Sequence, residues 1–263
     1  MERIELVETG RDAEALLAGD GPFDVIAAFA RSFYLRDAAG RICCVGTRAV
    51  GSGPLNALAA ALPALPGTGT RLRGADIDRA HAMPWRAAPL APLRREGLRS
   101  RIAAVAASGP RGLAAALPAI LGAAWQPADP FLAAAVGPLC ALREWKEGEP
   151  PEALGALIGL GPGLTPAGDD ALGGAGIALR ATGRGAQADR LAAWLAVRAP
   201  AATGEIAWAH LRAALRGEGH AALHTAIAAI ASGSEPDLAA IDAIGHSSGW
   251  DALAGALAVL AQA

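Results

Sequence analysis

Hydrophobic and polar positions follow two different patterns along the 263-residue chain. Up to about residue 86, strand-favouring residues gather in DVIAAFARSFYLRD (24–37) and RICCVGT (41–47), with the turn-like AAG between them. This arrangement predicts a hairpin around residues 38–40. The partly alternating RLRGADIDRAH (71–81) predicts a further strand, and GSGPLNALAAAL, in which glycines give way to apolar helix formers, predicts a helix over residues 54–62.

From Leu93 onward the pattern is helical, because alanine and leucine dominate while glycine and proline separate the segments. The predicted helical segments are 93–108, 111–125, 129–145, 151–159, 186–199, 204–217, 220–232 and a last one through residue 260. Together the two patterns predict an α+β fold, with a smaller mixed N-terminal region over residues 1–90 and a larger helical C-terminal region over residues 91–263. The two regions form either separate units or one compact domain.

Composition and charge narrow the classes of partner. Hydrophobic residues make up 53% of the chain, enough for a sizeable core, while a formal net charge of -2 favours neither nucleic acid nor an anionic membrane. Cys43, Cys44 and Cys140 form neither a disulfide framework nor a CxxC metal site. The first 21 residues carry acids where a secretory signal has a basic flank. We therefore expect a cytoplasmic protein that binds neither nucleic acid nor membrane.

The stretch GLGPGLTPAGDDALGG (159–174) is the first of two motifs that combine glycines with aspartates. Thr165 suits the N-cap of a helix, with Pro166 at the first helical position, where a missing N–H costs nothing. Asp169 and Asp170 then lie in the first turn, where the helix dipole favours carboxylates. The glycines before the cap let a ligand approach the main chain closely.

The second motif, AIGHSSGWDALAGALAVL (243–260), repeats this design near the C-terminus. An offset of 81 residues aligns the two motifs and pairs Asp170 with Asp251 and Gly174 with Gly255. Ser248 is then the expected N-cap of the second helix. We predict that the two helices pack as a pseudo-symmetric pair through their small faces, with both N-termini pointing into one site.

Such a site suits an anion, because free N–H groups at a helix N-terminus bind negative charge. The catalytic candidates are polar side chains at the two helix starts: Asp169, Asp170, His246 and Asp251. The ligand-binding candidates are Gly161, Gly163, Thr165, Gly168, Ser247, Ser248 and Gly249, joined by Arg48 and Asn56 at the glycine-rich turn of residues 51–56. Asp169 and Asp170 are also candidate ligands for Mg²⁺ together with a phosphate. The alternative is purely structural, with aspartates that only complement the dipole and glycines that only allow packing.

GLGPGLTPAGDD and GHSSGWDALAG resemble the motifs of a bacterial family that includes a subunit of oxamate carbamoyltransferase. That enzyme interconverts oxalurate and phosphate with oxamate and carbamoyl phosphate. VGSGPLNAL (50–58) and IAWAHLRAALRGEGHAAL (206–223) are similar to weaker family motifs. Thr203 is retained, whereas Ala207 stands where a serine is common, which puts a hydroxyl contribution from that helix in doubt.

The resemblance implies a cytoplasmic subunit that works beside other subunits in allantoin and ureide nitrogen metabolism, on small anions that helix N-termini suit. Two alternatives stay open. One is a non-catalytic subunit that binds a metabolite or acts as a scaffold, and the other is a Mg²⁺-dependent hydrolase that uses Asp169, Asp170 and Asp251. His220 and His224, spaced i, i+4, fit a solvent-facing pair better than a zinc site, since no third ligand or HExxH glutamate accompanies them.

Overall fold

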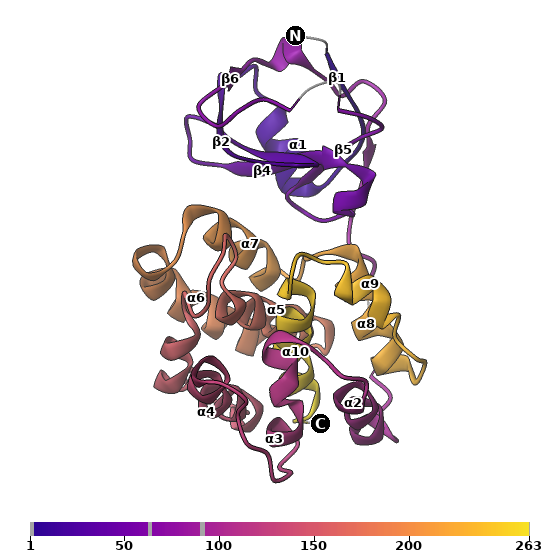
Figure 1. Ribbon diagram of the computed structural model, residues 1–263, viewed down its shortest axis with the longest axis vertical. Coiled ribbons are helices and arrows are strands. Elements are labelled where there is room, and N and C mark those ends of the chain that lie inside the picture. Colours follow the sequence, from indigo (N-terminus) through magenta and orange to yellow (C-terminus); the bar gives the residue numbers. More distant parts are fainter. Residues whose placement is uncertain (1–2, 63–64, 90–92, 263) are drawn as a thin grey trace. The chain divides into compact units, whose positions relative to one another are not determined.

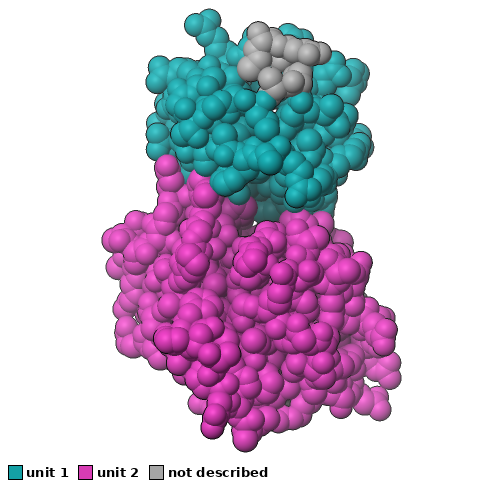
Figure 2. All heavy atoms as spheres, viewed as in Figure 1, with its two compact units in different colours: residues 1–87 teal, residues 88–263 magenta. Residues whose placement is uncertain are grey.

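The computed structural model describes residues 3–62, 65–89 and 93–262. The chain divides into two compact units, residues 1–87 and 88–263 (Figure 2). Among the described residues, strands lie in the first unit and the second is built of helices, which confirms the predicted α+β class. No helix in the described part of the chain is long and apolar enough to cross a membrane.

In its described residues, unit 1 is a sheet with the α-helix α1 (Arg11–Leu17) and two 3-10 turns. Its strands are β1 (Ile4–Thr9), β2 (Phe23–Phe29), β3 (Ser32–Arg36), β4 (Ile42–Thr47), β5 (Asn56–Ala59), β6 (Arg71–Leu72), β7 (Ile77–Asp78) and β8 (Met83–Pro84). The order is β6-β2-β3-β4-β5-β1-β7, and β8 pairs with β1. Alternate residues of β3, such as Phe33 and Leu35, point into a core that also holds Leu16 of α1.

The predicted hairpin is confirmed, since β3 and β4 pair antiparallel from Ser32 opposite Gly46 to Arg36 opposite Ile42. The Asp37 side chain closes the turn by accepting the N–H groups of the residues at 39 and 41, at 3.0 and 2.8 Å.

The helix expected in this half was wrong, whereas two of the stretches expected to form strands each hold two strands. Residues 54–62 contain strand β5 instead of a helix, because Asn56–Ala59 is buried between β4 and β1, where backbone pairing overrides the helix preference of alanine. The stretch 24–37 holds two antiparallel strands, β2 and β3. Residues 71–81 hold two short strands, β6 and β7, with a 3-10 turn between them.

Unit 2 consists of helices and 3-10 turns. These are α2 (Leu98–Ala107), η3 (Gly112–Ala116), α3 (Leu117–Ile120), α4 (Pro130–Glu144), η4 (Glu152–Leu157), α5 (Ala167–Ala181), α6 (Gly185–Ala202), α7 (Glu205–Leu215), α8 (Ala221–Ser232), α9 (Leu238–Asp242) and α10 (Ser248–Leu260). Helices α5 and α10 lie side by side in the middle of this unit, with the others around them (Figure 1). Most residues of both helices are buried, so this pair forms the centre of the hydrophobic core.

The contact between α5 and α10 is backbone against backbone. A Cβ on Gly174 would lie 1.7 Å from the carbonyl oxygen of Ala252, and a Cβ on Gly255 would lie 1.8 Å from that of Ala171. Only glycine permits so close an approach. The same 81-residue offset relates the two glycines and the two alanines, so the contact is reciprocal. This confirms that the helices pack as a pseudo-symmetric pair through their small residues.

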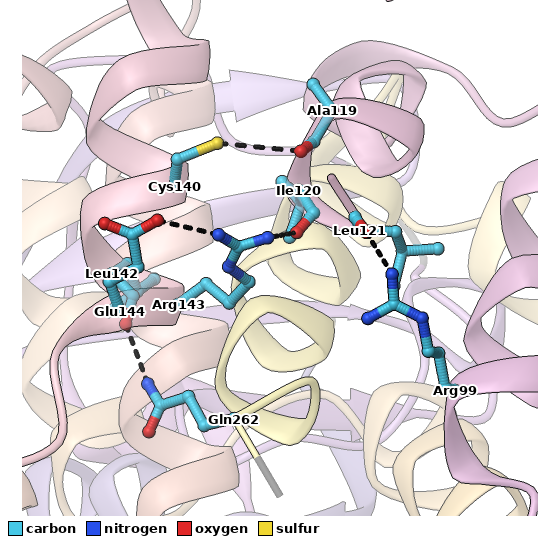
Figure 3. Close-up of polar contacts among 9 residues, drawn as sticks. All are labelled: Arg99, Ala119, Ile120, Leu121, Cys140, Leu142, Arg143, Glu144 and Gln262. Atoms are coloured by element: carbon cyan, nitrogen blue, oxygen red, sulfur yellow. Dashed lines mark hydrogen bonds and ion pairs between the residues drawn. The ribbon is translucent and has the colours of Figure 1, made fainter. Parts of the chain in front are cut away.

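Arginine side chains fix the short helix α3 beside this core. Arg143 of α4 donates to the carbonyl oxygen of Ile120 at 2.5 Å, and Arg99 of α2 donates to that of Leu121 (Figure 3). These carbonyls are at the end of the helix, where they have no partner within it and where the dipole favours a cation. Gln262 also donates to a carbonyl of α4, which holds the last residues of the described chain against the unit.

Candidate functional site

Helix α5 begins at Ala167, with Pro166 as its N-cap. The prediction that Thr165 is the N-cap was therefore wrong by one residue. The reason is that its hydroxyl contacts the second motif instead of its own helix, since Thr165 Oγ1 lies 3.1 Å from Ser248 Oγ. Gly168 is fixed by packing, since a Cβ there would lie 1.9 Å from the carbonyl oxygen of Leu157.

Helix α10 begins at Ser248, with Ser247 as its N-cap, so the prediction for Ser248 was also wrong by one position. Its hydroxyl faces Thr165 of the other motif instead of capping its own helix. Gly249 repeats the constraint found at Gly168, because a Cβ there would lie 2.1 Å from the carbonyl oxygen of Ile241. Each central helix therefore has a first-turn glycine against a carbonyl of the short helix that precedes it.

The amides of these two glycines are used within the chain. Gly168 N–H donates to the carbonyl oxygen of Leu160 at 2.9 Å, and Gly249 N–H donates to that of Ile244 at 3.2 Å. The sequence made both glycines candidates for ligand binding through free N–H groups. Their amides already have acceptors, so they shape the two helix starts rather than offering free donors.

Asp169 is turned into the protein. The carboxylate accepts the N–H of Gly159 at 3.0 Å and the hydroxyl of Thr203, which lies just before α7. Burial raises the pKa of Asp169, and these two donors oppose that rise. The carboxyl therefore ties the glycine-rich loop to the junction of α6 and α7.

Asp251 is almost fully buried and also accepts a backbone donor. Its Oδ1 accepts the N–H of Leu113, from η3, at 2.6 Å. Burial raises the pKa of Asp251, while the Leu113 N–H, the Ser247 hydroxyl and the nearby His246 oppose the rise. Gly112 makes room for this bond, because a Cβ there would lie 2.2 Å from Asp251 Oδ1.

Asp170 differs from both. The residue is partly exposed, but its Oδ2 atom is buried and has no hydrogen-bond partner among the described residues. Burial raises the pKa of Asp170 well above its ordinary value, against the hydroxyls of Ser248 and Thr165, and the charges of Asp251 and Asp169 raise it further. The carboxyls of Asp251 and Asp169 therefore both lie near Asp170. Of the three, Asp170 is the carboxyl whose protonated form the surroundings favour most strongly.

The loop in front of α5 and the loop in front of α10 remain exposed. Gly161 and Gly163 have φ values of +108° and +102°, which side-chain-bearing residues rarely adopt, and Gly163 faces open space. His246 is exposed, and Ser247 is partly exposed. Among the described residues, no group of three or more His, Cys, Asp or Glu side chains is arranged to hold a metal ion.

Arg48 and Asn56 belong to unit 1, whereas both motifs belong to unit 2. Arg48 is exposed in the 3-10 turn η1 (Arg48–Val50). Asn56 is buried, and its side-chain amide donates to the carbonyl oxygen of Gly51 at 2.8 Å, which closes the turn of residues 51–56. The side chain of Asn56 thus has a structural partner within its own unit.

The histidine pair of α8 does not face solvent together, so that expectation was wrong. His220 is the N-cap, and its Nδ1 accepts the N–H of Ala222 at 3.1 Å. His224 is buried, its Nε2 accepts the N–H of Gly219 at 2.9 Å, and burial lowers its pKa to about 4. One ring nitrogen of each histidine thus accepts a backbone N–H at the start of the helix.

Sequence reasoning missed two groups that hold the aspartates. Thr203 was noted only as a retained family residue, and its contact with Asp169 joins positions 34 residues apart. Leu113 contributes only its backbone N–H, from a position 138 residues before Asp251. Nothing in the side chain of a leucine indicates such a role. The nearest signal is Gly112 beside it, in a segment read as helix.

Comparison with known families adds to this geometry. Residues 157–260 match the family model of oxamate carbamoyltransferase subunit AllH. The match covers both glycine-aspartate motifs and the helices between them, and it confirms the resemblance drawn from those motifs. Searches of curated proteins and of solved structures gave no match.

Proposed function

We propose that this protein is a subunit of an oxamate carbamoyltransferase-like enzyme. Its helical unit binds a small ureide or amide anion, together with phosphate or carbamoyl phosphate, at the joint start of α5 and α10. The observation that carries this proposal is the 3.1 Å contact between the hydroxyls of Thr165 and Ser248. It joins the two motifs inside the segment that matches the family.

Charge repulsion from the aspartates does not prevent binding of an anionic ligand. Three carboxylates facing one anion would repel it, but Asp169 and Asp251 are turned toward donors of the chain itself. The surroundings of Asp170 favour its protonated, neutral form. The helix N-termini add a positive potential, and hydroxyl groups donate hydrogen bonds, so the balance at this point favours an anion.

The reaction of the matched family requires one proton transfer. A phosphate oxygen attacks the carbamoyl carbon of oxalurate, the bond from that carbon to the oxamate nitrogen breaks, and carbamoyl phosphate forms. The proton lost by phosphate ends on the amide nitrogen of oxamate. Asp170 in its protonated form and the exposed His246 are the side chains that we propose for this transfer. The hydroxyls of Thr165 and Ser248 are the donors that we propose for the oxyanion that develops on the carbamoyl oxygen.

A thermal-shift screen tests the binding part of this proposal. The purified protein is heated with phosphate, carbamoyl phosphate, oxamate, oxalurate or Mg²⁺, and a ligand that binds the folded state raises Tm through mass action. We expect one or more of the anions to raise Tm at millimolar concentration. Asp170→Asn, Asp251→Asn and Ser248→Ala should reduce that rise, whereas Ser100→Ala, at an exposed position of α2, should leave it unchanged.

An activity assay, taken together with the binding screen, decides between a catalytic subunit and a scaffold. Carbamoyl phosphate formation is measured with the chain alone and with a complex reconstituted from its partner subunits. Activity that appears in the complex and falls with Asp170→Asn supports the proposal. A chain that binds none of the anions, and whose Asp170→Asn variant leaves the complex fully active, is a scaffold.

A further inference from the structure

The segment from Arg111 to Leu113 lies outside the family match yet reaches both sides of the second motif. Leu113 N–H holds Asp251 of α10, as described above. The guanidinium of Arg111 forms an ion pair with Asp242, at 2.5 Å, at the end of α9. Asp242 in turn accepts the indole N–H of Trp250 at 2.7 Å. One short segment is thereby connected to the end of α9 and to the first turn of α10.

These contacts lie on either side of the loop that carries the polar candidates. Residues 243–247 connect α9 to α10, so the Arg111 ion pair fixes the start of this loop and the Leu113 hydrogen bond fixes its end. A charge-assisted bond to a buried carboxylate is stronger than a neutral one. The loop contains His246 and Ser247, and Ser248 follows directly after it.

Gly112 is the position on which this arrangement depends. Its φ is +53°, and a Cβ would meet Asp251 Oδ1 at 2.2 Å and the Cβ of Ser247 at 3.1 Å. A methyl group at this position displaces the carboxylate or moves η3 away from α10. Either movement shifts Ser248 from its place opposite Thr165.

We infer that residues 111–113 form a positioning segment for the site, which holds the loop before α10 through Asp251 and Asp242. This inference rests on the proposed function, because it assigns the segment to the same anion site. The segment itself is not proposed to contact the ligand. It acts through Asp251, and the effect of changing it is an effect on the placement of Ser247 and Ser248.

Gly109 provides a matched control for Gly112. Gly109 lies just before η3 and Gly112 is the first residue of η3; both have positive φ, +78° at Gly109, but a Cβ on Gly109 would meet nothing within 4 Å. Gly109→Ala and Gly112→Ala therefore share the backbone strain, and only the second disturbs Asp251. The measurement is the dissociation constant of inorganic phosphate and of oxamate, by titration calorimetry on the full chain below the Tm of each variant.

We expect Gly112→Ala to weaken binding of a probe at least tenfold and Gly109→Ala to change it less than twofold. In an Asp251→Ala background, Gly112→Ala should cause no further loss of affinity, because its effect passes through that carboxylate. If Gly112→Ala does not fold, Arg111→Gln takes its place, with an expected loss of about threefold.

Three results would overturn the inference, and each is distinguishable from the others. If the wild type binds a probe and Gly112→Ala, or Arg111→Gln in its place, binds it equally well, the positioning role is wrong while the proposed function stands. If the wild type binds neither probe, the proposed site fails, and the inference fails with it. Equal losses at Gly109 and Gly112 would indicate a general effect of strain and would also overturn it.

Discussion

Helices α5 and α10 have the same backbone design but hold their acids in different ways. In both, a glycine in the first turn lies against a carbonyl of the preceding short helix, and a later glycine lies against the partner helix. At the equivalent acidic positions the likeness ends. Asp251 accepts a backbone N–H, whereas Asp170 Oδ2 has no hydrogen-bond partner in the described chain.

This difference shows that the position of the two helix starts and the protonation of their acids depend on different residues. The reciprocal glycine contacts set where the two helix starts lie, and they need only small residues at a fixed offset. The partner of each acid comes from elsewhere in the chain, so two equivalent carboxyls differ in their ease of protonation. A pseudo-symmetric frame thus produces an asymmetric site, with one acid turned toward the backbone and one left for other contacts.

Breaking the common frame should have the largest effect. Gly174→Ala or Gly255→Ala forces a Cβ within 2 Å of a carbonyl oxygen, and we expect each to lower the free energy of unfolding by about 3 kcal/mol or more. Urea denaturation measures the change. Gly137→Ala in α4 is the control, since a Cβ there meets nothing within 4 Å, and it should stay within about 1 kcal/mol of the wild type. Comparable losses at all three glycines would refute the close contact between α5 and α10.

The contrast between the acids is tested by one substitution at two equivalent positions. Asp251→Ala leaves the buried Leu113 N–H without an acceptor, and we expect a loss of about 1–3 kcal/mol in the free energy of unfolding. Asp170→Ala removes one oxygen without a hydrogen-bond partner and leaves behind only the hydroxyls of Ser248 and Thr165, not a buried backbone N–H, so its effect should be clearly smaller. Chemical denaturation of both variants at pH 7 measures the difference. The contrast fails if Asp170→Ala is the more damaging change.

The third carboxyl, Asp169, has no acidic counterpart in α10, where Trp250 occupies the equivalent position. Thr203→Val keeps the shape of the side chain but removes the hydroxyl that donates to Asp169, and we expect a loss of about 1 kcal/mol. Thr225→Val, on the exposed side of α8, should cost less. Thermal unfolding of the two variants in parallel measures the difference. Equal decreases in Tm would contradict a specific role for the Thr203 hydroxyl.

The smallest expected change in stability comes from removing the charge on Asp170. Unlike the substitutions above, this one should stabilise the protein, and it should do so least at acidic pH. Its pKa is raised by burial in the folded protein, so the folded state holds the proton more tightly than the unfolded state does. Stability from this group is therefore present at low pH and is lost as pH rises through the raised pKa. Asp170→Asn has no carboxyl to ionise, so it does not lose this stability. The difference in the free energy of unfolding between Asp170→Asn and the wild type should therefore shift in favour of the variant from pH 4 to pH 8. Denaturation curves across this range measure it, and a constant difference would count against a raised pKa.

Local sequence was sufficient where the structure depends on residue type alone. Alanine and leucine with glycine and proline between them gave the helical half, and the offset between the motifs gave the paired packing of α5 and α10. Residues 54–62 were misread because NALA is helix-favouring in isolation and becomes a strand only between two neighbours. The two caps were misplaced by one residue, since each hydroxyl is directed to the other motif.

What the sequence by itself determined is the pair of glycine-aspartate helix starts and the family that they resemble. Close helix contact requires glycine at particular positions, and that requirement is visible in the residues themselves. The tertiary structure alone decided which donors hold each aspartate: Thr203 for Asp169 and the Leu113 N–H for Asp251. These partners are distant in sequence, and one of them is a backbone group that every residue except proline carries. The ease of protonation of each carboxyl depends on such partners and on burial, so it follows from the folded chain and not from the motif.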